Sequence, residues 1–182
     1  IFNEDALRFK EEKLSTKNIT VYGNLPYNIS TQLLVKWIMT SKWPPWYNCL
    51  ILMFQKEVAE RIVAKTNTSS YGRLSIMSNL KLKIKKEFDV SKNCFFPKPK
   101  IDSSVITFYP IKNSIYKNLR AEKLEFITRN FFSNRRKMIR KNYYKIFKTD
   151  RVKNKLQLNL NLRPENLTPE TYYKLSSLLK LD

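Results

Sequence analysis

The pattern of hydrophobic and polar positions changes along the chain. In the first part, short apolar runs alternate with segments whose apolar residues recur every three or four positions, whereas the second part contains only such recurring segments. The run at residues 49–54 is continuously apolar, which is typical of a strand buried on both faces. We expect strands at residues 19–22, 48–54, 82–88 and 104–109. We expect helices at residues 30–40, 56–65, from about 74, 121–132, 135–147, 151–158 and 169–179.

This order of elements predicts the fold class. Strands that alternate with helices indicate an α/β layer with a mostly parallel sheet. The run of helices that follows indicates a smaller, all-helical domain. We therefore expect a first domain at residues 1–110 and a helical second domain at residues 111–182.

Composition excludes several classes of site. The chain has 182 residues and no His, which removes His-based triads, His general bases and His-containing metal sites, so we expect no metal. Only two Gly are present, so neither a P-loop nor a G-x-G-x-x-G turn exists within these residues. The two Cys lie far apart, which suits a reduced, cytoplasmic protein. The longest apolar stretch is too short to cross a bilayer, so we expect no membrane partner.

The charge of the chain indicates a polyanionic partner. Lys and Arg number 35 against 15 acidic residues, giving a net charge of +20. Part of this excess can be compositional, because A·T-rich coding sequence favours Lys, Asn and Ile. The densest cluster is Arg135-Arg136-Lys137 followed by Arg140-Lys141, and on the expected helix four of these cations share one face. A solvated helix face is the ordinary alternative to a phosphate-binding surface.

Asn24-Leu25-Pro26-Tyr27 follows the first expected strand and carries a specific chemistry. The exocyclic amine of adenine is a poor nucleophile, because its lone pair is delocalised into the ring. A site that methylates it needs acceptors for both N–H protons and an aromatic surface for the base. Asn24 and the Leu25 backbone each offer a carbonyl, Pro26 stiffens the turn, and Tyr27 offers a ring. The alternative is an ordinary strand-to-helix turn.

Four further stretches accompany this motif, at residues 55–61, 71–75, 95–105 and 134–140. Together with residues 24–30 they closely resemble the ribosomal RNA adenine dimethyltransferase family, in particular its small-subunit (KsgA-type) branch. The resemblance extends to residues 163–168. It implies a Rossmann-like class I methyltransferase sheet followed by a helical RNA-binding domain.

The resemblance also implies a reaction. Methyl groups from S-adenosylmethionine would be transferred twice to N6 of each of two adjacent adenosines near the 3′ end of small-subunit (16S) rRNA, during ribosome biogenesis. The partner would be the small-subunit rRNA or the immature small subunit, bound by a monomer. A sulfonium methyl is already a strong electrophile, so positioning suffices without a strong base.

Residue roles follow from the matched motifs. Asn24 and the Leu25 carbonyl would hold the N6 protons, with Pro26 stiffening the turn, while Tyr27 and Phe95 would cover the two faces of the flipped adenine. The resemblance assigns cofactor binding to Asp5, Ala6 and Asn24. It assigns RNA binding to seven cations: Arg73, Lys98, Lys100, Arg135, Arg136, Lys137 and Arg140.

The match has one departure. The family's glycine-rich cofactor turn, and the acid that holds the cofactor ribose, lie upstream of the Asp5 motif. We therefore expect these residues to be a fragment holding strands four, five, seven and six of the family's sheet, with strand four as a bare edge. We also expect this fragment to bind S-adenosylmethionine weakly or not at all.

Two other functions stay open. A non-catalytic RNA-binding or ribosome-assembly module would keep the basic helices without needing Asn24, Tyr27 and Phe95. A large-subunit rRNA methyltransferase of the macrolide-resistance type shares the Asn-x-Pro-Tyr and F-x-P-x-P patterns. The stretches at residues 55–61 and 71–75 favour the small-subunit enzyme. Leu25 speaks against DNA adenine and protein glutamine methyltransferases, which more usually carry Pro at that position.

Overall fold

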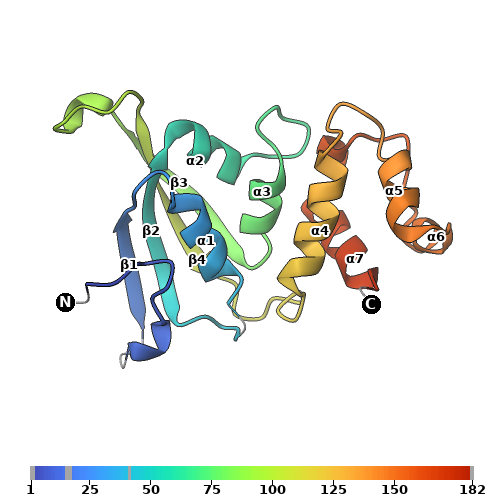
Figure 1. Ribbon diagram of the computed structural model, residues 1–182, viewed down its shortest axis with the longest axis horizontal. Helices are drawn as coiled ribbons and strands as arrows, with labels where there is room; N and C mark the ends of the chain where they lie inside the picture. The colour runs from blue at the N-terminus through green and yellow to red at the C-terminus, as the bar shows by residue number, and fades with distance from the viewer. Residues whose placement is uncertain (1–2, 15–17, 41, 181–182) are drawn as a thin grey trace. The chain divides into compact units, whose positions relative to one another are not determined.

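The chain folds into two compact units in a computed structural model that describes residues 3–14, 18–40 and 42–180 (Figure 1). The first unit comprises Ile1–Val63 and Lys81–Ser114, and the second comprises Ala64–Leu80 and Ile115–Asp182. The second unit thus takes in residues 64–80 as well as the C-terminal helices. The expected catalytic and RNA-binding roles of the two parts stay predictions.

The first unit is built on a four-stranded sheet. Its strands are β1 (Ile19–Asn24), β2 (Tyr47–Gln55), β3 (Leu82–Val90) and β4 (Ser103–Pro110). Their order in the sheet is β1-β2-β4-β3, which is the order implied for the last four strands of the family's sheet. In the described residues, β1 pairs on one side only, with β2.

The pairing corrects the expectation of a mostly parallel sheet. β1 and β2 are parallel, but β4 lies between β2 and β3 and is antiparallel to both. Among adjacent pairs, only the first is therefore parallel. The reason lies in the connection, because the chain between β3 and β4 contains a single short 3-10 turn (Lys92–Cys94) and no crossover helix, and parallel neighbours require a crossover.

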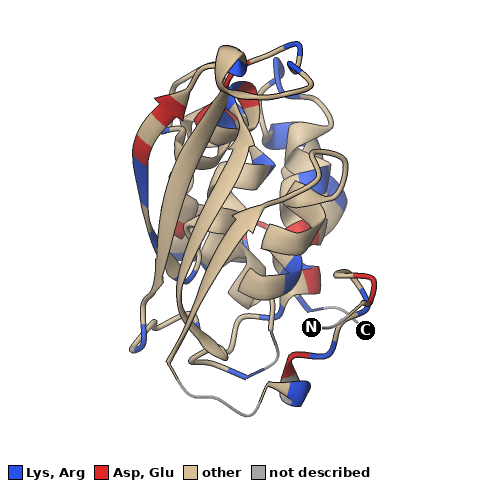
Figure 2. Cartoon of the chain, turned by 90° about the vertical axis from the view of Figure 1, so that its left-hand side faces the viewer, with Lys and Arg blue, Asp and Glu red and all other residues tan. Residues whose placement is uncertain are grey.

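Two helices cover one face of this sheet, as Figure 1 and Figure 2 both show. They are α1 (Ser30–Ile38) and α2 (Lys56–Val63). Alternate residues of β2 (Leu50, Leu52 and Phe54) are fully buried, as are Leu33 and Ile38 on α1. The apolar run of β2 therefore forms the centre of the first core. A short 3-10 turn, Glu11–Lys13, precedes β1.

Charge on the sheet is confined to one strand. β1, β2 and β4 contain no charged residue, whereas β3 carries Lys83, Lys85, Lys86, Glu87 and Asp89 (Figure 2). β3 is an outer strand of the sheet. Charges on an outer strand discourage pairing with a strand of another chain.

The second unit consists of helices. They are α3 (Arg73–Ser78), α4 (Ala121–Phe132), α5 (Arg140–Phe147), α6 (Arg151–Leu156) and α7 (Pro169–Leu178), with a 3-10 turn at Pro164–Asn166. Its core is aromatic, because Tyr71, Phe131, Tyr143 and Tyr172 are almost completely buried. Each of the three tyrosine hydroxyls donates to a backbone carbonyl, which satisfies the buried polar group.

One helix starts later than expected. Residues 134–139 form a turn, in which the Lys137 amide donates to the Asn134 carbonyl at 2.9 Å. The amide of the fully buried Ile139 donates to the Leu162 carbonyl at 2.9 Å, so it is held by another segment. The prediction of a helix from residue 135, with four cations on one helix face, is therefore wrong. The other helices end within about two residues of the expected positions, the usual uncertainty of helix ends.

Within the described residues, no helix is long and apolar enough to span a membrane.

Candidate active site and nucleic-acid interface

The Asn24–Tyr27 loop lies at the carboxyl end of β1 and turns directly into α1. The Pro26 carbonyl accepts hydrogen bonds from the Ile29 amide (3.1 Å) and the Ser30 amide (3.0 Å). Ser30 Oγ donates to the Tyr27 carbonyl at 3.1 Å. Asn24 is exposed, and its side-chain amide has no hydrogen-bond partner among the described residues. The loop is thus fixed while the Asn24 amide is free to meet a ligand.

Gly23 allows β1 to end close to β2. A Cβ at this position would lie 2.8 Å from Leu52 Cδ2 and 2.9 Å from Leu25 Cδ2, too close for any larger residue without movement. Asn24 follows directly and pairs in register with Met53. The absence of a side chain at position 23 therefore determines how close to β2 the backbone of Asn24 lies.

A hydrogen bond fixes the Tyr27 ring. Tyr27 Oη lies 2.9 Å from Ser103 Oγ, on a residue 76 positions later in the chain. Ser103 is fully buried at the start of β4, where it pairs with both Gln55 and Val90. The half-buried Tyr27 side chain is thereby tied to the end of an interior strand of the sheet.

The loop at residues 91–102, which carries Phe95, is anchored at the same end of the sheet. Asp102 Oδ1 accepts from the Lys92 amide at 2.9 Å, and the Asp102 carbonyl accepts from the Lys56 amide at 3.0 Å. Phe95 is half-buried, its neighbour Phe96 is fully exposed, and Phe95 makes no ring contact with another described aromatic side chain. The structure brings this loop and Tyr27 together through the adjacent residues Asp102 and Ser103.

The Asp5 segment is a separate turn held on α1. Asp5 Oδ1 accepts from the Leu7 amide at 2.9 Å, and Arg8 lies 3.7 Å from the other oxygen. Lys36 on α1 donates to the Phe9 carbonyl at 2.6 Å and pairs with Glu11 at 2.8 Å. The Asp5 side chain is 53% exposed. Its carboxylate therefore keeps acceptor capacity for a ligand's amine, whereas no described contact joins it to Asn24.

An ion cluster lies below the Phe95 loop. Asp89 accepts from Ser104 Oγ at 2.6 Å, and Lys86 and Lys56 lie 2.6 Å and 3.5 Å from its carboxylate. Hydrogen bonds from Lys86 and Ser104 lower the pKa of the Asp89 carboxyl from 3.8 to about 2. This acid is thus already compensated within the protein. Lys98 and Lys100 are exposed on the loop above it and have no ion pair among the described residues.

The predicted RNA-binding cations of the second unit divide into two groups. Arg135 is engaged internally, with its Nε 2.9 Å from Glu165 Oε2 and its Nη2 donating to the Thr68 carbonyl at 3.1 Å. Arg73 pairs with Glu125 at 3.2 Å. In contrast, the exposed residues without an ion pair in the described chain are Arg136, Lys137 and Arg140. An RNA-binding role for Arg135 stays a prediction, beside the structural role that its contacts show.

Three motif stretches, at residues 71–75, 134–140 and 163–168, converge in the second unit. Tyr71 Oη donates to the Leu167 carbonyl at 2.9 Å, and Arg135 binds Glu165. Sequence reasoning did not assign the anchoring roles of Asp102, Ser103 and Glu165. All three lie inside the motif stretches at residues 95–105 and 163–168, and this position was the only feature of the sequence that indicated their importance.

Among the described residues, no three Cys, Asp or Glu side chains lie close enough together to hold a metal ion.

Comparison with known proteins agrees with these motifs. The family model described as "Ribosomal RNA adenine dimethylase" matches residues 1–181. Ribosomal RNA small subunit methyltransferase A of Pelagibacter ubique is 48% identical over 176 residues, which cover 96% of this chain and 67% of that protein. The protein of the same name from Wolbachia sp. subsp. Drosophila simulans is 45% identical over 178 residues, which cover 97% of this chain and 64% of that protein.

Solved structures show the same fold. The crystal structure of a dimethyladenosine transferase from Plasmodium falciparum gives a TM-score of 0.76 at 28% identity, covering 96% of this chain and 70% of that one. The 23S rRNA methyltransferase ErmE gives a TM-score of 0.60 at 19% identity, which shows the fold alone. The sheet is thus Rossmann-like, of the methyltransferase type, and the chain spans roughly two thirds of the length of its curated relatives. The chain belongs to the ribosomal RNA adenine dimethylase family.

Proposed function

We propose that this protein dimethylates N6 of two adjacent adenosines near the 3′ end of small-subunit rRNA, with S-adenosylmethionine as the methyl donor. Its substrate would be the rRNA of the immature small subunit. The observation that carries the proposal is Asn24-Leu25-Pro26-Tyr27 at the carboxyl end of β1, with a free Asn24 amide and a Tyr27 ring fixed through Ser103. Family membership supports it.

Asn24 and Leu25 would activate the amine. The Asn24 side-chain carbonyl accepts a hydrogen bond from one N6–H, and the Leu25 backbone carbonyl accepts one from the other. After the transfer, N6 loses one proton to solvent. As the new C–N bond forms, N6 becomes positively charged, so both hydrogen bonds strengthen in the transition state more than in the ground state. No general base of raised pKa is required. This agrees with a chain that has no His.

Tyr27 and Phe95 would hold the flipped base. Removing a base from its stack costs a few kcal/mol, and aromatic stacking of about 1–3 kcal/mol per base offsets that cost. The Tyr27 ring is already oriented by its hydrogen bond to Ser103. Phe95 lies on a loop whose two ends are anchored through Asp102, so the two rings come from rigid supports.

Asp5, Ala6 and Asn24 would hold part of the cofactor. The exposed Asp5 carboxylate has lone pairs left for an adenine amine, so the residues present fit that part of the group. When bound, S-adenosylmethionine supplies an electrophilic methyl group on a sulfonium. The protein's own task is then to place N6 in line with that methyl and to exclude water.

Exposed cations would hold the RNA backbone. Lys98 and Lys100 lie on the Phe95 loop, while Arg136, Lys137 and Arg140 lie on the second unit. All five lack ion pairs within the described chain and can therefore meet phosphates directly.

The test is the identity of the modified nucleotide. Immature small subunits and large subunits, each lacking adenine methylation, are incubated with the protein and S-adenosylmethionine, and the digested rRNA is analysed by mass spectrometry. We expect N6,N6-dimethyladenosine at two adjacent positions near the 3′ end of the small-subunit rRNA. Dimethyladenosine in large-subunit rRNA alone would transfer the assignment to the macrolide-resistance type. RNA binding without methylation of either rRNA, where calorimetry shows that S-adenosylmethionine is bound, would favour the non-catalytic module.

A further inference from the structure

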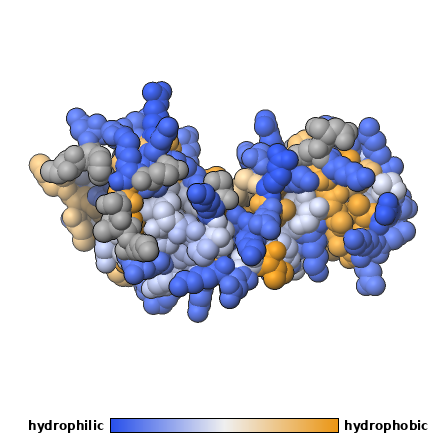
Figure 3. Space-filling model, turned by 90° about the horizontal axis from the view of Figure 1, so that it is seen from below, coloured by the Kyte–Doolittle hydropathy of each residue, from blue (hydrophilic) through white to orange (hydrophobic). Residues whose placement is uncertain are grey.

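The second unit contains a cavity of about 450 Å³ bounded by α5, α6 and the end of α7. About half of its wall is apolar, formed by Ile146, Phe147, Val152, Leu178 and Leu179. Figure 3 shows hydrophobic surface over this end of the chain, framed by hydrophilic side chains. The volume lies within the range of about 300–1,000 Å³ that is usual for ligand sites.

The charged residues that line this cavity are all cations. They are Arg151, Lys155 and Lys180, and none of them has an ion pair among the described residues. Arg151 and Lys155 lie four positions apart on α6, so they share one face of that helix. The neighbouring acid, Asp150, is already engaged by Tyr144 Oη at 2.8 Å and Lys153 Nζ at 2.9 Å. The cavity therefore offers uncompensated positive charge at an apolar wall.

One wall is a rigid aromatic surface. Phe147 stacks on Tyr143, with ring centroids 5.0 Å apart and planes inclined by 30°. Tyr143 is fully buried, and its hydroxyl donates to the Thr149 carbonyl at 2.9 Å and accepts from the Lys153 amide at 2.6 Å. Since Phe147 also lines the cavity, it can present ring surface that Tyr143 does not cover.

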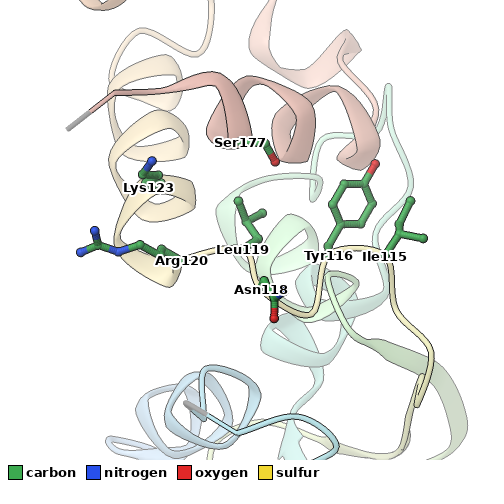
Figure 4. A pocket seen from close by; sticks show the side chains of 7 residues that line it. All are labelled: Ile115, Tyr116, Asn118, Leu119, Arg120, Lys123 and Ser177. Carbon is green, nitrogen blue, oxygen red and sulfur yellow. The ribbon is translucent and has the colours of Figure 1, made fainter.

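A second pocket in the same unit differs in its cations. It has a volume of about 280 Å³ and is lined by Arg120, Lys123 and five other residues (Figure 4). Here Lys123 Nζ donates to the Leu179 carbonyl at 2.7 Å, and Arg120 pairs with Glu122 at 3.5 Å. Both cations are thus used within the protein. Free cations at an apolar wall distinguish the larger cavity.

We propose that the larger cavity binds an unstacked base of single-stranded RNA, with Arg151 and Lys155 contacting the phosphates beside it. A nucleotide combines the two features that the cavity offers, an apolar flat ring and an adjacent negative charge. Three more exposed cations without described ion pairs, Lys141 and Lys145 on α5 and Lys148 directly after it, continue the charge, which suits a partner with regularly spaced phosphates. The inference rests on the proposed function, because it assumes that the protein binds rRNA.

Methyl NMR of the protein tests this placement directly. The side chains of Ile146, Val152, Leu178 and Leu179 are labelled, and the protein is titrated with a single-stranded RNA hexamer and with an abasic hexamer of equal charge. We expect the hexamer to shift the Val152 and Leu178 signals. The abasic hexamer should reach the same shift only at about tenfold higher concentration. Equal titration by both would overturn the base-in-cavity placement. Stronger shifts with an acidic amphipathic peptide would overturn it in favour of a protein partner.

Charge variants sharpen the result. Arg151→Gln with Lys155→Gln should raise the midpoint of the Val152 titration about tenfold, since it removes two phosphate contacts. The control pair Lys65→Gln with Lys174→Gln removes the same charge from exposed positions of this unit that do not line the cavity, and should change the midpoint less than twofold. Equal effects of the two pairs would contradict a specific site.

Phe147→Leu provides a second variant that keeps the wall apolar. It should reduce the preference for the hexamer over the abasic hexamer without changing the salt dependence of binding. An unchanged preference would overturn the role of the ring. Methyl transfer by the parent protein is measured in the same preparation, so that absence of the proposed activity is recognised separately from an empty cavity.

Discussion

The hydrogen bond between Tyr27 and Ser103 should couple the base-binding loop to the sheet. Tyr27→Phe removes only the hydroxyl and leaves the ring. Ser103 Oγ is buried and has Tyr27 Oη, at 2.9 Å, as its described partner, so the change leaves a buried polar atom unsatisfied. Such an orphan costs about 1–3 kcal/mol, whereas removing both partners costs less.

A double-mutant cycle isolates this interaction. Tyr27→Phe alone should lower the free energy of unfolding of the first unit by ~1–2 kcal/mol, and adding Ser103→Ala should recover part of that loss. All three Trp residues (Trp37, Trp43 and Trp46) belong to the first unit, so urea unfolding followed by Trp fluorescence reports on this unit alone.

The same cycle predicts a kinetic effect. If Tyr27→Phe costs ~1 kcal/mol of the free energy that positions the ring, this variant should transfer methyl groups about fivefold more slowly in a single turnover. Strictly additive losses in the cycle, in both stability and rate, would refute the claim that the hydroxyl pair positions the ring.

Three further predictions concern other parts of the structure. Arg136→Ala with Lys137→Ala should weaken rRNA binding and reduce the slope of log K against log salt by about 1–2. Arg135→Ala should mainly lower the thermal stability measured by circular dichroism. Equal salt slopes for the two variants would contradict the division of these cations. Gly23→Ala should lower the free energy of unfolding of the first unit by ~1–3 kcal/mol, because its Cβ would lie 2.8 Å from Leu52, and an unchanged urea midpoint would show that the strand end can relax. The pKa of Asp89 is lowered to about 2, so its stabilising contribution is present above the unfolded-state pKa near 3.8 and is lost as the pH falls toward 2. The free energy of unfolding of Asp89→Asn should therefore fall less than that of the parent over that interval. Parallel profiles of stability against pH for the two proteins would refute the assignment.

Periodicity predicted the elements well where burial follows a single period. The continuous run of β2 and the amphipathic pattern of α4 gave bounds within one residue of those observed. Periodicity failed at residues 134–139, because the Ile139 amide is held by the Leu162 carbonyl and the Arg135 side chain by Glu165, which no local pattern shows. The antiparallel pairing of β4 with β3 follows from their short connection, whereas its pairing with β2 is a contact that no local pattern contains.

The candidate site was partly visible in the sequence. Asn24 and Tyr27 could be named, since their chemistry suits an adenine amine and its ring. Asp102 and Ser103 could not be assigned roles, because their importance comes from partners at Lys92, Lys56 and Tyr27 that lie distant in the chain or across a loop.

The central claim is that Asn24 activates N6 of the bound adenine. The most direct measurement is the single-turnover rate of methyl transfer to immature small subunits by Asn24→Ala at saturating S-adenosylmethionine. The affinity for rRNA is measured in parallel, and Asn113→Ala is the control at an exposed position of the same unit. We predict that Asn24→Ala slows transfer on the order of 100-fold while affinity for rRNA changes less than twofold, since the lost hydrogen bond is strongest in the transition state. Asn113→Ala should match the parent in both measurements. A parental transfer rate for Asn24→Ala would contradict the account.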